Sequence, residues 1–488
     1  MSFVSIRFFV LIMVTALVYY KLPHRFRWIW LLLVSYFFYL SYDPRYTVFL
    51  AVSTLTTYGC GLLIADRRTA HRKKLWVALS FLINVGILIA LKYLNLFSSM
   101  LAGVLAVFGC SIPAHQFSLL LPVGISFYMF QSLSYTVDVY RGDVEPERNL
   151  GKYALFVSFF PTLTAGPIQK AKEALPRFDE VHSFDYKEAR KSCLLILFGY
   201  FQKMVVADRL SVLVNTVYAD PAKYHGLDSI VAVLFYSMQI YCDFAGYSNI
   251  AIGISELLGF RLAANFDRPY FSSSMKDFWR RWHISLSTWF RDYLYIPLGG
   301  NRCSAFRQSL NVMTVFAVCG LWHGASLTFL VWGVLHGLYQ VVGKLTKHFR
   351  ELFCQKLKID AGSAPFRAAK IIFTFLLVTF AWIFFRADTL ENAFIMIRNM
   401  FLFDPAAFQS GSIFQLGLSG AEFPAALIGI LIVWLVDCLQ KKTDPRELVL
   451  KKGTAFRWTF YITAAMVILI FGQYGPINSA QQFIYAQF

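Results

Sequence analysis

VMTVFAVCGLWHGASLTFLVWGVLHGLYQVV, residues 312–342, is the stretch that decides the fold. It lies inside a run, residues 311–343, that contains no Lys, Arg, Asp or Glu. A single helix over these residues would be about 46 Å long, whereas the hydrocarbon core of a bilayer is about 30 Å thick. Gly320 and Gly324 flank His323 near the middle of the run. We therefore predict either a kinked helix or two membrane elements that meet at His323.

The composition of the whole chain agrees with a membrane protein. Of its 488 residues, 57% are hydrophobic and only 15% are charged, and the mean hydropathy is +0.53. Soluble globular chains carry about 25% charged residues. The apolar runs are far longer than barrel strands, so we predict an all-α polytopic membrane protein with roughly 11–13 membrane helices. The expected elements are residues 3–20, 28–42, 46–65, 75–91, 94–108, 119–137, 153–166 (interrupted by Pro161), 193–206, 229–258, the two halves of 312–342, 371–385, 425–439 and 458–471.

The net charge of +18 could suggest a nucleic-acid partner, but the basic residues fall in short loops between apolar runs. That is the positive-inside pattern, and some of these residues are expected to touch lipid head groups. The basic loops at residues 21–27 and 66–74 are assigned to the cytoplasm, and residues 472–488 carry no charge. We therefore place the N-terminus and the C-terminal tail outside the cytoplasm. Residues 1–488 are expected to form a single membrane domain, in which residues 455–488 supply the last helix and an extracytoplasmic tail.

Two histidines suggest proton-transfer chemistry. An imidazole in an apolar membrane run is costly, so His323 is expected to have a partner or a task. It could take a proton from a hydroxyl or thiol and return it, or it could simply bond to a neighbouring helix. His283 lies in a motif-rich segment, residues 275–296, whose spacing predicts an amphipathic interfacial helix. Arg280, Arg281 and His283 could line a mouth for an anionic or acyl-bearing group, or the helix could be an ordinary interfacial one.

Three further residues are candidates. Asp243 stands in an apolar stretch, where it could orient a histidine, pair with an arginine or make a structural hydrogen bond. His336 would lie about 140° around from His323 on an unbroken helix, which favours a structural role. Tyr485 lies in the uncharged tail and becomes a nucleophile only if a base takes its proton. The eight cysteines form no metal-binding spacing, and no phosphate loop or metalloprotease motif occurs, so we expect no metal and no bound cofactor.

The motifs resemble those of the membrane-bound O-acyltransferase family. They are DFWRRWHISLS at residues 277–287, RDYLYIPLGGNR at 291–302 and GLWHG at 320–324. The resemblance is strongest over residues 126–338, and within the family it points to the branch of alginate and peptidoglycan O-acetylation and teichoic-acid D-alanylation proteins. It implies a ring of helices around a thin central core, with funnels open to both sides. The chain would reside in the cytoplasmic (inner) membrane.

The resemblance also implies a reaction and its residues. His323 would be catalytic, His283 its companion near the cytoplasmic side, and Tyr485 a covalent acyl relay; Ala486 stands where a second aromatic residue is more usual. The acyl group, expected to be acetyl, would come from acetyl-CoA or an acyl-carrier thioester. It would pass through an extracytoplasmic partner of the SGNH-hydrolase type to an envelope polysaccharide. The residues expected to bind substrate are Arg280, Arg281, Trp282, Trp322, Asp243 and His336.

Four alternatives remain open at this point. His323 could activate a lipid or glycan hydroxyl directly, without a relay. The acyl group could be D-alanyl rather than acetyl. A transporter without covalent chemistry would predict inverted repeats, and the sequence shows no internal repeat. A scaffold that only recruits envelope enzymes would tolerate the loss of His323.

Overall fold

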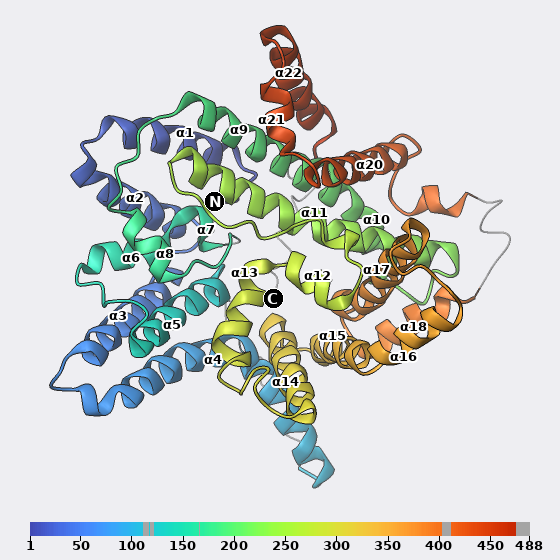
Figure 1. The fold of residues 1–488 in the computed structure, drawn as a ribbon, viewed down its shortest axis with the longest axis horizontal. Helices are drawn as coiled ribbons and strands as arrows, with labels where there is room; N and C mark the ends of the chain where they lie inside the picture. The colour runs from blue at the N-terminus through green and yellow to red at the C-terminus, as the bar shows by residue number, and fades with distance from the viewer. Residues whose placement is uncertain (111–116, 118–121, 165, 403–410, 475–488) are drawn as a thin grey trace. The chain divides into compact units, whose positions relative to one another are not determined.

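The computed structural model describes residues 1–110, 117, 122–164, 166–402 and 411–474, and over these residues it contains helices and no β-strand (Figure 1). The all-α prediction is therefore confirmed. Two compact units divide the described chain: residues 1–193 with 251–263, and residues 194–250 with 264–474.

The first unit contains the N-terminal helices. They are α1 (Ile6–Lys21), α2 (His24–Leu40), α3 (Tyr46–Ala65), α4 (Lys73–Val107), α5 (Ile125–Arg141), α6 (Leu150–Ser158), α7 (Phe160–Leu163), α8 (Ala171–Arg177) and the start of α9 (Tyr186–Tyr200). The predicted interruption at Pro161 is confirmed, because α6 ends at Ser158 and α7 begins at Phe160. The prediction of two elements at 75–91 and 94–108 is wrong. One continuous helix, α4, covers both, since no glycine or proline separates them.

The second unit contains the segments with the sequence motifs. It comprises a π-helical turn (Phe201–Ala207), α10 (Asp208–Ala219), most of α11 (Leu227–Leu257), α12 (Met275–Arg281), α13 (Ile284–Phe290), α14 (Ala305–His323), α15 (Leu327–Leu345), α16 (Lys347–Lys356), α17 (Ala364–Arg386), α18 (Leu390–Met400), α20 (Glu422–Gln440), α21 (Pro445–Leu450) and α22 (Thr454–Phe471). The predicted break at His323 is confirmed, because α14 ends on that residue and α15 starts four positions later.

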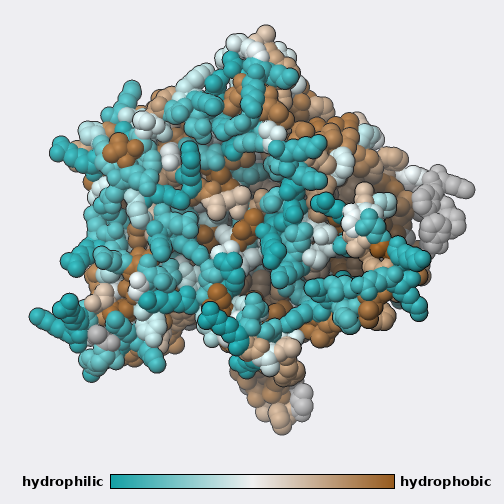
Figure 2. Space-filling view, viewed as in Figure 1, coloured by the Kyte–Doolittle hydropathy of each residue, from teal (hydrophilic) through white to brown (hydrophobic). Residues whose placement is uncertain are grey.

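Six helices in the described part are long and apolar enough to cross a membrane: α3, most of α4, α11, α17, α20 and α22. The chain is accordingly a polytopic membrane protein. Its surface fits this conclusion, since large apolar side chains on α4 are exposed, with Leu82 at 72% and Leu101 at 60%. Figure 2 shows apolar surface gathered over the projecting end of α4, at the bottom of the view, beside hydrophilic side chains. Apolar side chains on a membrane helix lose nothing by facing lipid chains.

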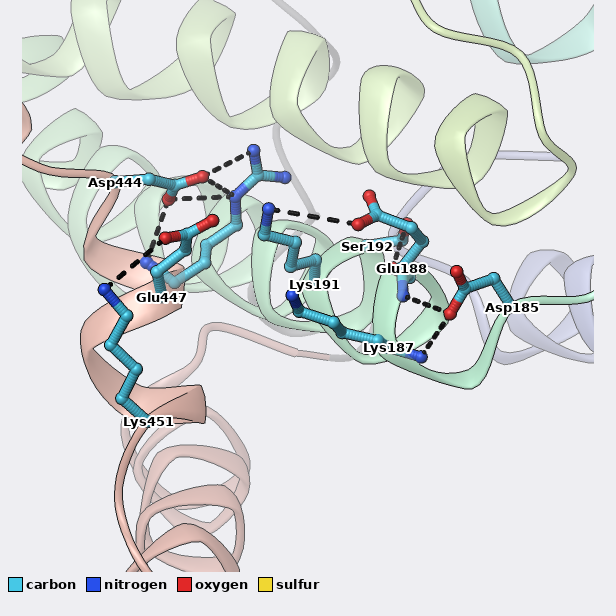
Figure 3. Close-up of polar contacts among 9 residues, drawn as sticks. Asp185, Lys187, Glu188, Lys191, Ser192, Asp444, Glu447 and Lys451 are labelled. Carbon is cyan, nitrogen blue, oxygen red and sulfur yellow. Dashed lines mark hydrogen bonds and ion pairs between the residues drawn. The ribbon is translucent and has the colours of Figure 1, made fainter.

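The polar helix ends are capped by carboxylates. In the first unit, Asp185 accepts hydrogen bonds from the backbone N–H groups of Lys187 and Glu188 at 2.7 and 3.2 Å, which starts α9 (Figure 3). In the second unit, Asp444 caps the start of α21, and Lys451 lies 3.8 Å from Glu447 one turn back along the helix (Figure 3). Such caps satisfy backbone donors that no carbonyl within the helix can reach.

Candidate active site

His323 stands at the last position of α14. The helix ends there because Gly324 takes an extended conformation, with φ −166° and ψ 163°. The Ser326 hydroxyl then accepts a hydrogen bond from the Thr328 N–H at 3.3 Å and starts α15. The apolar run therefore makes a helical hairpin, and its turn carries the histidine.

The two helices of this hairpin pack backbone to backbone through glycines. A Cβ atom added to Gly320 would lie 2.4 Å from the Phe329 carbonyl oxygen, and one added to Gly333 would lie 2.3 Å from that of Phe316. Neither position has room for a side chain. The close approach at Gly320 and Gly333 lets α15 pack directly against α14.

The imidazole of His323 is buried and surrounded by aromatic rings. It is 3% exposed. Its ring centroid lies 4.7 Å from that of Trp322, 4.8 Å from Trp332 and 5.3 Å from Phe385. Nδ1 lies 2.7 Å from the Cys319 carbonyl oxygen, which can only accept. Nδ1 must therefore carry the proton, and the neutral ring has its lone pair on Nε2.

His283 lies between α12 and α13 in a left-handed conformation, with φ +43°. It is 1% exposed, and its Nδ1 lies 3.2 Å from Asn265 Oδ1. The edge of its ring meets Phe244 at 4.6 Å between centroids, and Trp322 lies 6.4 Å away. Because Trp322 also contacts His323, one indole touches both histidine rings.

The segment 275–296 is not the single amphipathic helix that its spacing predicts. The chain is extended at Trp282 and left-handed at His283, so α12 and α13 are separate helices, and a π-helical turn (Arg291–Tyr295) follows. Phe278, Trp282 and Leu286 are nevertheless buried, as the predicted apolar face requires. The break allows His283 to be buried as well.

His336 lies on α15, and its ring and that of His323 both contact Trp332. It is fully buried, and its Nδ1 accepts a hydrogen bond from Trp279 Nε1 at 3.2 Å. An indole N–H can only donate, so neutral His336 carries its proton on Nε2, opposite to the other two histidines. The rings of His323 and His336 both contact Trp332, at 4.8 and 5.0 Å. This placement gives His336 a supporting position in the aromatic cluster.

The arginines and Trp282 occupy different surroundings. Arg280 is exposed on α12, whereas Arg281 is partly buried and forms ion pairs with Asp277 at 3.0 Å and Asp267 at 3.7 Å. Trp282 is 1% exposed and packs against Trp382 at 5.1 Å between ring centroids. Of the predicted substrate-binding residues, the structure therefore brings Trp322, His336 and Trp282 into the aromatic cluster around the histidines. Trp282 joins it through Trp382, which stacks on Trp332 at 5.7 Å between ring centroids. Tyr485 lies outside the described residues.

Asp243 belongs to a buried ion cluster that the sequence analysis missed. Its carboxylate pairs with Lys203 of the π-helical turn, and Lys203 Nζ also lies 2.8 Å from Asp208 Oδ1. All three side chains are at least 95% buried. Close backbone packing accompanies the cluster, since a Cβ on Gly246 would lie 2.8 Å from the Gly199 oxygen. A lysine inside the expected span 193–206 was the signal that could have revealed it.

A second buried carboxylate also escaped the sequence analysis. Asp437 of α20 is 4% exposed, and its two oxygens lie 3.1 and 3.0 Å from the hydroxyl of Tyr241 on α11. The Tyr241 ring lies 6.3 Å from that of Trp282, the neighbour of His283. Asp437 thus holds the hydroxyl of a tyrosine whose ring contacts Trp282 of the aromatic cluster. Among the described residues, no group of three or more His, Cys, Asp or Glu side chains is arranged to hold a metal ion.

This arrangement is suited to general acid–base chemistry. Two buried imidazoles share Trp322, and each has its tautomer set by an oxygen acceptor at Nδ1. The basic atom of each neutral ring is therefore Nε2. Aromatic walls that exclude water strengthen electrostatic interactions with a reacting group.

The chain is similar in sequence to one family model and to several known proteins. Residues 147–385 match the family model described as MBOAT, membrane-bound O-acyltransferase family. The chain is 36% identical over 482 residues to the probable alginate O-acetylase AlgI of Pseudomonas putida, with 96% of each chain covered. It is 33% identical over 403 residues to the peptidoglycan O-acetyltransferase of Helicobacter pylori, covering 76% of this chain and 73% of the relative. It is 32% identical over 246 residues to the teichoic acid D-alanyltransferase of Streptococcus thermophilus, covering 46% of this chain and 57% of the relative.

Proposed function

Because the chain belongs to the membrane-bound O-acyltransferase family and is therefore an acyltransferase, we propose that it moves an acetyl group across the cytoplasmic membrane for O-acetylation of an envelope polysaccharide. The donor is a cytoplasmic thioester, either acetyl-CoA or an acyl-carrier protein. One observation supports acetyl over D-alanyl: the relatives named as O-acetylating proteins match 96% and 76% of this chain, whereas the teichoic acid D-alanyltransferase matches 46%.

The position of His323 is the observation that carries the proposal. Its Nδ1–H is held by the Cys319 carbonyl, so Nε2 is the atom that takes the proton of an acceptor hydroxyl. The hydroxyl oxygen then bonds to the thioester carbonyl carbon, and the carbon–sulfur bond breaks. His323 returns the proton to the departing thiolate. Protons balance over the cycle, and no further reactant is needed.

The acceptor hydroxyl in this proposal is that of Tyr485. Its tail follows α22 in sequence and carries no charge, which suits the extracytoplasmic side under the positive-inside pattern. The acetyl-tyrosine then passes its acyl group to a serine of an SGNH-hydrolase-type partner, which acetylates the polysaccharide. His283 and its neighbours Arg280 and Arg281 receive the thioester donor from the cytoplasmic side.

Acyl transfer by purified variants tests the proposal. We expect His323→Gln to lower thiol release from acetyl-CoA by roughly 100-fold or more, because general acid–base catalysis contributes about 10²–10⁴-fold. Tyr485→Phe should abolish the acetyl adduct on the C-terminal peptide in mass spectrometry. His348→Gln, on the exposed helix α16, is the matched control and should retain full activity. Wild-type rates in His323→Gln would refute the catalytic assignment.

One alternative is separated by the same experiment. If His323 activates a lipid or glycan hydroxyl directly, Tyr485→Phe keeps its activity and no tyrosine adduct forms. Substituting a D-alanyl thioester for acetyl-CoA distinguishes the acyl groups by their relative rates.

A further inference from the structure

Three hydrogen-bond donors meet at the side-chain oxygen of Asn265, a residue that no sequence motif singled out. Oδ1 lies 2.9 Å from Ser285 Oγ, 3.2 Å from the Ser285 backbone nitrogen and 3.2 Å from His283 Nδ1. Asn265 is 1% exposed. Its amide group therefore has to find its partners inside the protein.

The orientation of this amide is fixed by its partners. The backbone N–H of Ser285 can only donate, so the atom that faces it must be the amide oxygen. At the other end, Asn265 Nδ2 donates to Ser248 Oγ of α11 at 3.2 Å. Turning the amide over would place its NH₂ group against the N–H of Ser285, so only one orientation satisfies the site.

The backbone around Asn265 holds the amide beside the histidine. The Ile284 N–H donates to the Asn265 carbonyl at 2.9 Å, and the Asp267 N–H donates to the Arg281 carbonyl at 2.9 Å. These two bonds join the loop to the junction of α12 and α13. Residues other than glycine seldom adopt the left-handed conformation that His283 has. The two backbone hydrogen bonds, one on each side of His283, hold it in that conformation.

We propose that Asn265 is a positioning residue that keeps the proton of neutral His283 on Nδ1. The lone pair on Nε2 of His283 is then directed toward the thioester donor. This inference rests on the donor-binding role proposed for His283. An oxygen at Nδ1 requires a ring N–H there. His283 is then a hydrogen-bond acceptor for the donor molecule. A histidine of the opposite tautomer, such as His336, would offer an N–H instead.

The charges around His283 allow the inference to be tested by pH. Its packing neighbours are Phe244 on α11 and Trp322 on α14, and the titratable group beyond Trp322 is His323. On α11, Asp243 is paired with Lys203. An aspartate at position 265 would put a carboxylate directly on Nδ1, and a carboxylate favours the doubly protonated ring.

Two substitutions give different expected results. Asn265→Leu removes the acceptor, and we expect it to lower the transfer rate by roughly 10- to 100-fold, as the loss of a supporting hydrogen-bond partner commonly does. Asn265→Asp should keep activity at high pH, and the acidic limb of its rate profile should move up by about 1 pH unit or more. A purely structural role would not move this limb.

A double-mutant cycle completes the test. In a His283→Ala background, Asn265→Leu should cause no further loss, because Asn265 acts through that ring. Asn399→Leu is the matched control: Asn399 is a fully buried asparagine whose side-chain NH₂ donates to the Pro221 and Tyr224 carbonyls. It should lower activity by the same factor in both backgrounds. If Asn265→Leu does not fold, Ser248→Ala removes the anchor of the amide and should give a smaller loss with the same dependence on His283.

The outcomes separate the two proposals. If His283→Ala retains full activity, the role proposed for His283 fails and the inference fails with it. If His283→Ala lowers the rate but Asn265→Leu and Asn265→Asp match the wild-type rate and pH profile, only the inference is overturned. Equal losses from Asn265→Leu with and without His283 would also overturn it.

Discussion

Gly333→Ala should damage the protein through a single methyl group. The added Cβ would lie 2.3 Å from the Phe316 carbonyl oxygen, and the nearest atoms behind it belong to the Gly320 backbone, at 3.1 Å. Favourable carbon–oxygen contacts in helix interfaces are about 3.3–3.6 Å, so α14 and α15 would have to separate by roughly 1 Å. Overpacking of this kind costs about 1–3 kcal/mol. His323 lies one turn beyond Gly320, and a misplacement of about 1 Å can slow catalysis about 100-fold.

The same helix provides the control. A Cβ on Gly343 of α15 meets no atom within 4 Å. Gly343→Ala should therefore stabilise the helix by up to about 1 kcal/mol, and the two variants should differ in stability by roughly 1–4 kcal/mol. Thermal inactivation in detergent at matched heating rates measures the stability, and thiol release from acetyl-CoA measures the rate. Equal inactivation temperatures and equal rates for Gly333→Ala and Gly343→Ala would show that the close helix contact is unimportant.

Two further substitutions probe the buried carboxylates. Lys203→Met leaves Asp208 and Asp243 without their shared countercharge, and we expect the free energy of unfolding to fall by about 3–5 kcal/mol. The inactivation temperature should fall accordingly and should recover in part when Asp243→Asn is added. An unchanged inactivation temperature would contradict the pairing. Tyr241→Phe removes the hydroxyl that donates to Asp437 and should lower the free energy of unfolding by about 1–3 kcal/mol. Asp437→Asn should lower it less, because an amide oxygen still accepts the hydrogen bond. A larger loss of stability in Asp437→Asn than in Tyr241→Phe would contradict this hydrogen bond.

The helical hairpin around His323 could be predicted because the length of the uncharged run and the residues at its middle both indicated a break. A run of uncharged residues too long for one span, with glycines beside a polar residue in its middle, has few membrane solutions. The ends of α3 were predicted as the structure has them, at Tyr46 and Ala65, because charged or turn-forming residues lie close to both. These features depend on local sequence alone.

The surroundings of His283 could not be predicted in the same way. A period of 3.6 residues assumes an unbroken helix, and nothing in the motif indicates that His283 adopts a left-handed conformation. Asn265 fixes that conformation from a loop with no regular pattern. Lys203 and Asp437 were missed for a different reason. Each stood inside an expected span, and averaging hydropathy over the span concealed the cost of one charge.

The ion cluster of Lys203 also constrains how the chain enters the membrane. A lysine or aspartate at the centre of a helix costs about 2.5–3.5 kcal/mol on insertion scales, so the segment around Lys203 and Asp208 is a poor candidate for insertion alone. Lys203 pairs with Asp208 in the same part of the chain and with Asp243, which lies 40 residues later on α11. The ribosome must therefore synthesise about the first half of α11 before the ion cluster is complete. We expect the π-helical turn and α10 to wait at the insertion machinery and to enter the bilayer together with α11.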